Sequence, residues 1–225
     1  MKNNYILLLA LLVTLIASSC KKDYAVDGGT SQAQVNMTTY DYLKSKPIFS
    51  SLVHLIDRAG LKDAVNSDAT FFATTNYGIE EYRKAMKNIR AVELGNENIE
   101  YTLDSIPLWR LDSLKTYIFP GKLNREALSV QGQFYVSNFG QMANVRYNLR
   151  LSRSTGYGYV GPVDFVIYSK VVGTDDRDEL DQSKIPESQR DRSVFVQSSG
   201  IITTNGVVHA LDGWHRLFFN SDNAS

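Results

Sequence analysis

The spacing of apolar residues divides the chain into a helical first part and a strand-rich second part. Between residues 39 and 118, apolar positions recur every three or four residues, which is typical of amphipathic helices. This spacing predicts four helices. The first covers 40–45 with Thr39 as N-cap, and the second is opened by Pro47 and ended by Gly60. The third runs from an Asn76 cap to about residue 90. The fourth is opened by Pro107, and its inward-facing residues are Leu108, Leu111, Leu114 and Ile118.

Strand patterns begin with one buried run and then dominate the second half of the chain. Apolar and polar residues alternate there with period two. The pattern predicts strands over 69–74, 133–138, 143–151, 163–171, 193–198, 200–204 and 207–212. Two polar stretches, 91–105 and the highly charged 173–192, are expected to be loops. Helices followed by strands indicate an α+β fold.

The last two strands flank Asn205-Gly206, which is a strong hairpin signal. A two-residue type I′ turn needs positive φ at both central residues, and asparagine and glycine tolerate this best. We therefore expect a type I′ hairpin here, and we expect Gly206 to resist substitution because of its backbone conformation.

The first twenty residues have the features of an export signal. Lys2 precedes an apolar run over 6–16, and the small residues Ala17-Ser18-Ser19 precede Cys20. The apolar run is too short to span a bilayer as a helix. Cys20 is the single cysteine of the chain and cannot form an internal disulfide, so a lipidation site of bacterial lipoprotein type is favoured over a chance cysteine after an ordinary signal peptide.

These features predict the organisation of the chain and its location. Residues 1–19 are expected to be a lipoprotein signal peptide, and 20–37 the lipidated Cys20 and a flexible linker. One domain should cover 38–220, followed by a tail over 221–225. The cluster Lys21-Lys22-Asp23 is similar to the surface-export signals of Bacteroidota lipoproteins, which implies an outer-membrane protein exposed at the cell surface.

Charge composition argues against a nucleic-acid partner. Lysine plus arginine and aspartate plus glutamate both number 24, so the formal net charge is zero. The thirteen tyrosines and ten phenylalanines suit a β-rich domain, in the sheet and in the core.

Several motifs, in order, resemble those of fasciclin-like (FAS1) domains. Ala69 to Asn76 is similar to the first family motif, Leu114 to Leu123 to the central block, and Asn205 to Asp212 to the second motif. The residues that carry the resemblance are Thr70, Phe72, Asn76, Tyr117, Pro120, Gly121, Asn205, Gly206, His209 and Asp212. Two positions depart from the family pattern, since Thr74 replaces a common proline and Ile118 replaces a histidine. An integrin-binding role linked to that Tyr-His region is therefore not carried over.

The resemblance implies a fold and a class of function. The fold would be a fasciclin-like β-sandwich or wedge of about seven strands, with N-terminal helices packed at one side. The stretches 84–113 and 173–192 would be enlarged loops, which is where binding function often resides. The implied function is adhesion, or recognition of a protein or glycan. An accessory subunit of an outer-membrane nutrient-uptake complex, with a transporter as partner, is the alternative.

Candidate chemistry is sparse. His209, Asp212 and His215 could suggest a metal site, but the two histidines would lie about 20 Å apart along a continuous strand. His209 is better interpreted as a hydrogen-bonded structural residue, as the family motif also implies. Known motifs of serine hydrolases, zinc proteases and phosphate-binding loops are missing from the sequence. We therefore predict no catalytic residues, no metal and no cofactor, and a hydrolase is the least favoured interpretation.

Overall fold

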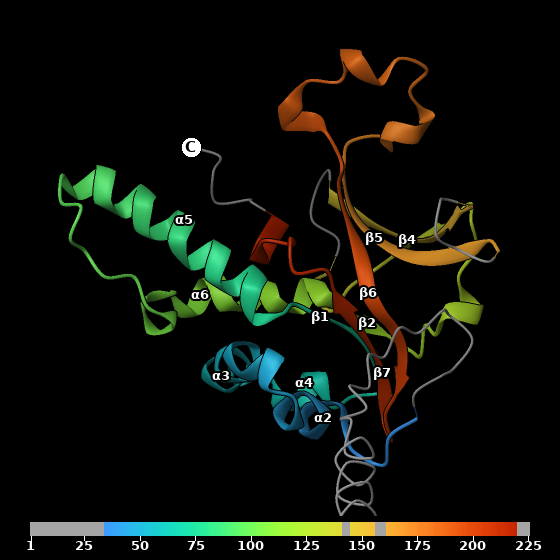
Figure 1. Ribbon diagram of the computed structural model, residues 1–225, viewed down its shortest axis with the longest axis horizontal. Coiled ribbons are helices and arrows are strands. Elements are labelled where there is room, and N and C mark those ends of the chain that lie inside the picture. Colours follow the sequence, from blue (N-terminus) through green and yellow to red (C-terminus); the bar gives the residue numbers. More distant parts are fainter. Residues whose placement is uncertain (1–33, 141–144, 156–160, 220–225) are drawn as a thin grey trace, which may run out of the picture.

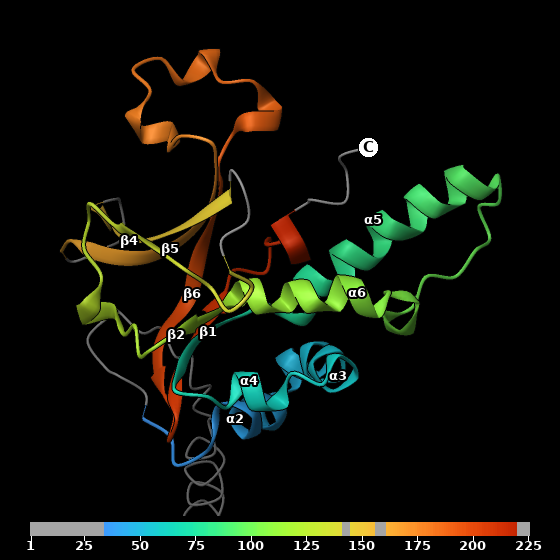
Figure 2. The ribbon, with the colours of Figure 1, turned by 180° about the vertical axis from the view of Figure 1, so that it is seen from behind.

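The computed structural model describes residues 34–140, 145–155 and 161–219. At its centre lies one seven-stranded sheet, in the order β2-β1-β7-β6-β5-β4-β3. The helices gather at one side of this sheet, as Figures 1 and 2 show from opposite directions. The predicted α+β class and the count of about seven strands are confirmed.

Apart from β1, which precedes α5 and α6, the elements follow the predicted order of helices before strands. The helices are α2 (Thr39–Ser45), α3 (Ser50–Ala59), α4 (Lys62–Val65), α5 (Asn76–Leu94) and α6 (Leu108–Leu111). The strands are β1 (Ala69–Ala73), β2 (Ile118–Pro120), β3 (Gln133–Tyr135), β4 (Val145–Ser154), β5 (Val163–Val172), β6 (Arg192–Ile202) and β7 (Gly206–Leu211). Within the described residues, no helix combines the length and apolarity needed to cross a bilayer.

The helical half differs from prediction mainly at the helix ends. Thr38, not Thr39, caps α2, because its side chain accepts the backbone N–H of Asp41. Pro47 opens a 3₁₀ turn, Pro47–Phe49, ahead of α3. Gly60 ends α3 in the left-handed conformation, as predicted. Helix α5 continues to Leu94, so the predicted loop over 91–105 begins four residues too early.

The predicted helix over 107–118 is split into three pieces. Helix α6 is one turn long, a 3₁₀ segment follows over Asp112–Tyr117, and Ile118 begins β2. Leu108 was predicted to face inward, but it is 63% exposed, whereas Leu111 and Leu114 are buried. The stretch 84–113 is therefore the outer part of α5, a connection and α6 rather than an enlarged loop.

Strand β6 joins the two parts of the sheet. Its first residues pair with β5, and its later residues pair with β7. The sheet bends along this strand, so that rings from strands that are not neighbours in the sheet meet. Phe72 of β1 stacks on Tyr168 of β5 with ring centroids 4.8 Å apart, and Phe119 of β2 meets both rings edge to face. An aromatic core thus fills the angle between the two parts.

Two errors in the predicted strands cancel in the total of seven. The stretches 193–198 and 200–204 were predicted as two strands, but they form one strand, β6, with register shifts between Val196 and Ile201. The three-residue strand β2 was missed, because its pattern merged with the preceding helix. The strand predicted over 133–138 also ends early, at Tyr135.

The predicted linker is wrong for residues 34–37. Gln34 forms a parallel bridge with Ile202, and the N–H of Val35 donates to the carbonyl of Ile202 at 2.8 Å. The N–H of Thr204 in turn donates to Met37. This segment therefore belongs to the folded domain. Cys20, the signal peptide and the tail 221–225 lie outside the described residues.

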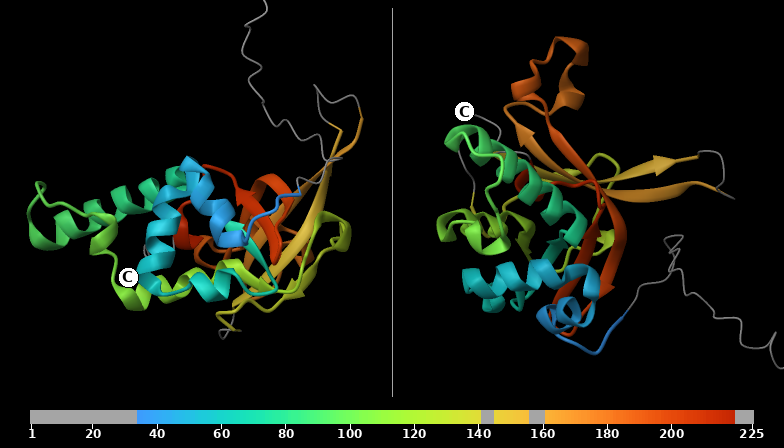
Figure 3. Two further views of the ribbon diagram at one scale, coloured as in Figure 1. Left: turned by 90° about the horizontal axis from the view of Figure 1, so that it is seen from below. Right: turned by 60° about the vertical axis from the view of Figure 1, so that its left-hand side comes forward.

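The charged stretch between β5 and β6 projects away from the sheet, as the right-hand view of Figure 3 also shows. It contains three 3₁₀ turns, Asp176–Asp178, Gln182–Lys184 and Glu187–Gln189, and appears at the top of Figure 1. Most of its residues are exposed, as predicted for a loop. Its base is organised by Asp191, whose carboxylate accepts the N–H groups of Val172 and Asp176. We call residues 174–190 the excursion.

Candidate functional site

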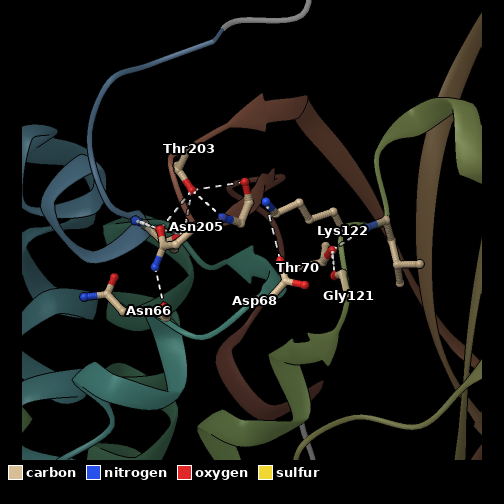
Figure 4. Close-up of polar contacts among 10 residues, drawn as sticks. Asn66, Asp68, Thr70, Gly121, Lys122, Thr203 and Asn205 are labelled. Carbon is tan, nitrogen blue, oxygen red and sulfur yellow. Dashed lines mark hydrogen bonds and ion pairs between the residues drawn. The ribbon is translucent and has the colours of Figure 1, made fainter.

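Asn205 ties the β6–β7 hairpin to the helices. Its side-chain oxygen accepts the N–H of Thr39 at 2.8 Å, at the start of α2, and its amide group donates to the carbonyl of Asn66, at the end of α4 (Figure 4). The hydroxyl of Thr203 also lies 3.3 Å from the same Asn205 oxygen. The asparagine therefore acts as a connector between three segments.

The turn at Asn205-Gly206 is not type I′. Neither residue is among the positive-φ residues of the described chain. Instead, the hydroxyl of Thr203 accepts the N–H of Gly206 at 2.9 Å and closes a tight connection. Gly206 is required for a different reason, because a Cβ there would overlap the carbonyl oxygen of Ala69 on the neighbouring parallel strand β1. The constraint is space rather than backbone conformation.

Thr70 performs a similar linking role on β1. Its hydroxyl donates to the carbonyl of Gly121 and accepts the N–H of Leu123, both at 2.7 Å (Figure 4). Pro120 pairs with Ala69 at the end of β2, and Gly121 follows with a φ of 81°. The first motif and the central block thus meet at this edge of the sheet.

His209 is a buried, fully hydrogen-bonded residue. Its Nε2 donates to the carbonyl of Leu123 at 2.8 Å, and its Nδ1 accepts the N–H of Gly200 at 3.2 Å. Gly200 can offer this N–H because β6 bulges opposite His209. Burial lowers the pKa of His209 to about 4, so the ring is neutral at pH 7. It stacks on Phe72 in the core.

Asn76 does not cap its own helix. Thr75 is the N-cap of α5, and Asn76 is the first helical residue. The Asn76 oxygen accepts the N–H of Ser51 at 3.0 Å, and its amide donates to Pro47. The side chain therefore caps the neighbouring helix α3 and fixes the start of α5 against it.

Tyr117 anchors the segment that follows β7. Its hydroxyl accepts the N–H of Phe218 at 2.8 Å and donates to Nε2 of His215 at 2.9 Å. Burial lowers the pKa of His215 to about 3, so this ring is also neutral and can accept. Phe218 and Phe219 both adopt positive φ, which is rare for bulky residues. Stacking of Phe219 on Tyr117 helps to hold this conformation.

Asp212 shapes the turn between β7 and His215. Its carboxylate accepts the N–H of Trp214 at 2.7 Å, and its carbonyl accepts the N–H of His215 at 3.0 Å. Gly78, in the first turn of α5, lies against this segment so closely that a Cβ would overlap the carbonyl oxygen of His215. The turn and the start of α5 are therefore in fixed contact, and Figure 1 shows the segment after β7 beside the N-terminal end of α5.

This contact presents two aromatic side chains to solvent. Trp214 is 93% exposed at the turn, and Tyr77 is 68% exposed at the start of α5. They line a groove of about 770 Å³, whose walls also include Ile48, Glu81, Gln197 and Asp212. We call it the Trp214 groove. A smaller hollow of about 360 Å³, which includes Phe195, shares Asp212, Trp214 and Arg216 with it.

Sequence reasoning assembled the motif residues but missed the groove. Two groups of motif residues lie away from the groove. The hydrogen bonds that tie β1 and the β6–β7 hairpin to neighbouring segments involve Thr70, Asn205 and Gly206, and the core contains Phe72 and His209. Tyr117 and Asn76 instead support the segments around the Trp214 groove from inside the fold, and Asp212 both shapes the turn and lines the groove. The sequence did contain two signals of the groove. One is the aromatic-glycine pair Tyr77-Gly78 at the start of a predicted helix, and the other is Gly213-Trp214 directly after a predicted strand.

The imagined metal site does not form. Within the part of the chain that the structure describes, no cluster of three or more histidine, cysteine or carboxylate residues could hold a metal ion. His209 lies in the core on Phe72, whereas His215 binds Tyr117.

Comparisons with known proteins gave a likeness among solved structures alone. No family model matches the chain, and no curated protein matches it. Among solved structures, the chain is similar to a FAS1 domain pair from the insect cell adhesion molecule fasciclin I, with a TM-score of 0.47 and 14% sequence identity. The match covers 78% of this chain and 49% of that chain, so the chain spans about half the length of the structure it matches.

Proposed function

We propose that this protein is a lipid-anchored recognition module of fasciclin type, displayed on the outer membrane and non-catalytic. Its sandwich or wedge would arise from the bend along β6. The family motifs in order along the chain support this proposal, together with the seven-stranded sheet on which they converge.

The observation that carries the proposal is that the motif residues near the Trp214 groove are used within the fold, whereas the aromatic residues of the groove are exposed. The motif side chains Tyr117 and Asp212 form hydrogen bonds within the fold, and His209 uses both ring nitrogens in the interior. Trp214 and Tyr77, by contrast, face solvent from a turn and a helix start that this scaffold positions. Exposed aromatic residues on a rigid, concave surface are typical of recognition sites.

The anchor rests on the sequence around Cys20. Replacing Cys20 by Ala should release the protein from membranes, because the attachment site for the lipid is lost. The measurement is the fraction of protein that remains in carbonate-washed membranes. A C20A variant that stays bound there would contradict lipidation.

An accessory subunit of an outer-membrane nutrient-uptake complex is the second candidate. The excursion favours it, since it projects from the domain and fully exposes Leu180. A mild-detergent pull-down of the intact lipoprotein from its own membranes separates the two functions. Recovery of a stoichiometric outer-membrane transporter would support the subunit, and recovery of the lipoprotein alone would support a free-standing adhesin.

A further inference from the structure

We propose that the Trp214 groove binds a neutral glycan chain, an inference that rests on the recognition function proposed above. Three properties of the groove point to this ligand class: its exposed aromatic walls, its balanced charge and its size.

The aromatic walls suit sugar rings. A pyranose ring has an apolar face of C–H groups and a rim of hydroxyls, so it packs against an exposed aromatic face while its hydroxyls remain hydrogen-bonded. Trp214 and Tyr77 offer two such faces, from different elements. Both belong to segments joined by the close Gly78–His215 contact. The backbones that carry the two rings are thus held together before any ligand arrives, which lowers the entropic cost of binding.

The charge of the groove disfavours an ionic ligand. The carboxylate of Glu81 pairs with the ammonium group of Lys84 at 3.0 Å, and both residues line the groove. Glu80 pairs with Arg83 at 2.7 Å, and this hydrogen bond lowers the pKa of the Glu80 carboxyl. Both glutamates are therefore paired with basic side chains. The lining also holds Asp212 and Arg216, one group of each sign, so neither sign dominates.

The remaining polar groups can bind hydroxyls. The exposed amide of Gln197 can both donate and accept, and the carboxylate of Asp212 retains acceptor capacity after binding the N–H of Trp214. A volume of about 770 Å³ lies within the range of pockets that bind small ligands. The adjoining hollow, which shares Trp214, offers a path for a chain to continue past it.

Affinity electrophoresis of the full-length lipoprotein in detergent tests the inference. The probes are native gels that contain an α-glucan, a β-glucan, a mannan or a xylan. At least one polysaccharide should retard the wild-type protein, and both W214A and Y77A should weaken that binding about tenfold or more. Because Trp214 and Tyr77 are exposed, both variants should fold, which their melting temperatures will verify.

The chain supplies a matched control. Trp109 is the only other tryptophan, is 75% exposed on α6 and does not line the groove. The W109A variant should bind as the wild type does. In W109F, Trp214 is the sole tryptophan, so the polysaccharide should shift its emission to the blue. W214F, which keeps only Trp109, should show no shift.

Three results would overturn the glycan inference. One is that no polysaccharide retards the protein, and another is that W214A and Y77A are retarded as strongly as the wild type. The third is a membrane partner protein whose capture is lost in W214A, which would assign the groove to a protein while leaving the recognition function intact. If the wild type binds neither polysaccharide nor partner, the proposed function fails as well.

Discussion

Glycine shows how one residue type can be required for two unrelated physical reasons. Gly200 has a φ of 72°, and a Cβ there would meet nothing within 4 Å. Gly206 has no positive φ, but a Cβ there would overlap the carbonyl oxygen of Ala69. The first is a conformational constraint and the second a steric one, and a sequence motif does not distinguish them.

Alanine at each position separates the two effects. G200A should lower the free energy of unfolding by about 1 kcal/mol, the usual penalty for positive φ without a clash. G206A should cost more, up to about 3 kcal/mol, because β1 and β7 must move apart. Urea unfolding of both variants measures the order. If G200A proves the more damaging, the steric explanation of Gly206 is wrong.

The two buried histidines should make stability depend on pH. Their pKa values in the fold are about 4 for His209 and about 3 for His215, below the value of about 6.5 for an exposed histidine. At pH values between 6.5 and the pKa of each buried histidine, the unfolded chain binds a proton that the folded chain does not. Stability is therefore retained above pH 6.5 and lost as pH falls, by about 1.4 kcal/mol per pH unit for each histidine.

A histidine variant isolates this dependence. Urea unfolding at pH 5 and pH 6 gives the change in unfolding free energy for the wild type and for H209Q. The variant should be less stable at both values, because it loses the paired bonds to Leu123 and Gly200, but its change with pH should be smaller by about 1.4 kcal/mol. An unchanged pH dependence would mean that His209 is already protonated in the fold.

At the scale of elements, local signals predicted most helices and strands but not their joints. Gly60 ended α3 as expected, because a left-handed C-cap is encoded by the glycine itself. Strand β2 was missed because three apolar residues after a helix carry no period of their own. The bulge in β6 places the N–H of Gly200 against the ring of His209 across the sheet, whereas the sequence predicted two strands with Ser199 between them.

In the candidate site too, the sequence predicted local features but not the contacts between distant segments. The motifs located the scaffold, because they contain the residues that bond across the fold. They did not reveal the Trp214 groove, whose aromatic walls come from α5 and from the turn after β7, two segments far apart in sequence that meet at Gly78 and His215. The sequence likewise predicted Asn76 as the cap of its own helix, but its side-chain oxygen accepts an N–H of the neighbouring helix α3.

The interhelical cap gives a prediction at this scale. N76A should destabilise the domain by about 1 kcal/mol or more, because the N–H of Ser51 loses its acceptor and the carbonyl of Pro47 loses its donor. N96A is the control, since Asn96 accepts only the N–H of Asn98 in an exposed turn and should cost less than about 0.5 kcal/mol. Thermal unfolding measures both. Equal effects would contradict the capping role.

For the whole molecule, the bent sheet and the excursion are structurally separable. The aromatic core lies between the two parts of the sheet, where Phe72, Phe119 and Tyr168 meet. The three 3₁₀ turns of the excursion contribute no fully buried side chain to it. Its base is closed independently of its tip, because Asp191 and Asp176 exchange hydrogen bonds at 2.9 and 3.0 Å.

Shortening the excursion should therefore leave the domain intact. A variant in which residues 178–190 are replaced by Gly-Ser-Gly keeps Arg177, whose guanidinium pairs with the buried carboxylate of Asp175. Its unfolding free energy should stay within about 1 kcal/mol of the wild type, since the removed turns add little burial and a shorter loop costs less entropy to close. Urea unfolding tests this, and a loss of several kcal/mol would show that the excursion supports the fold. The same variant, used in the membrane pull-down, addresses function: if a transporter is the partner and docks on the excursion, its capture should disappear while glycan binding at the Trp214 groove persists.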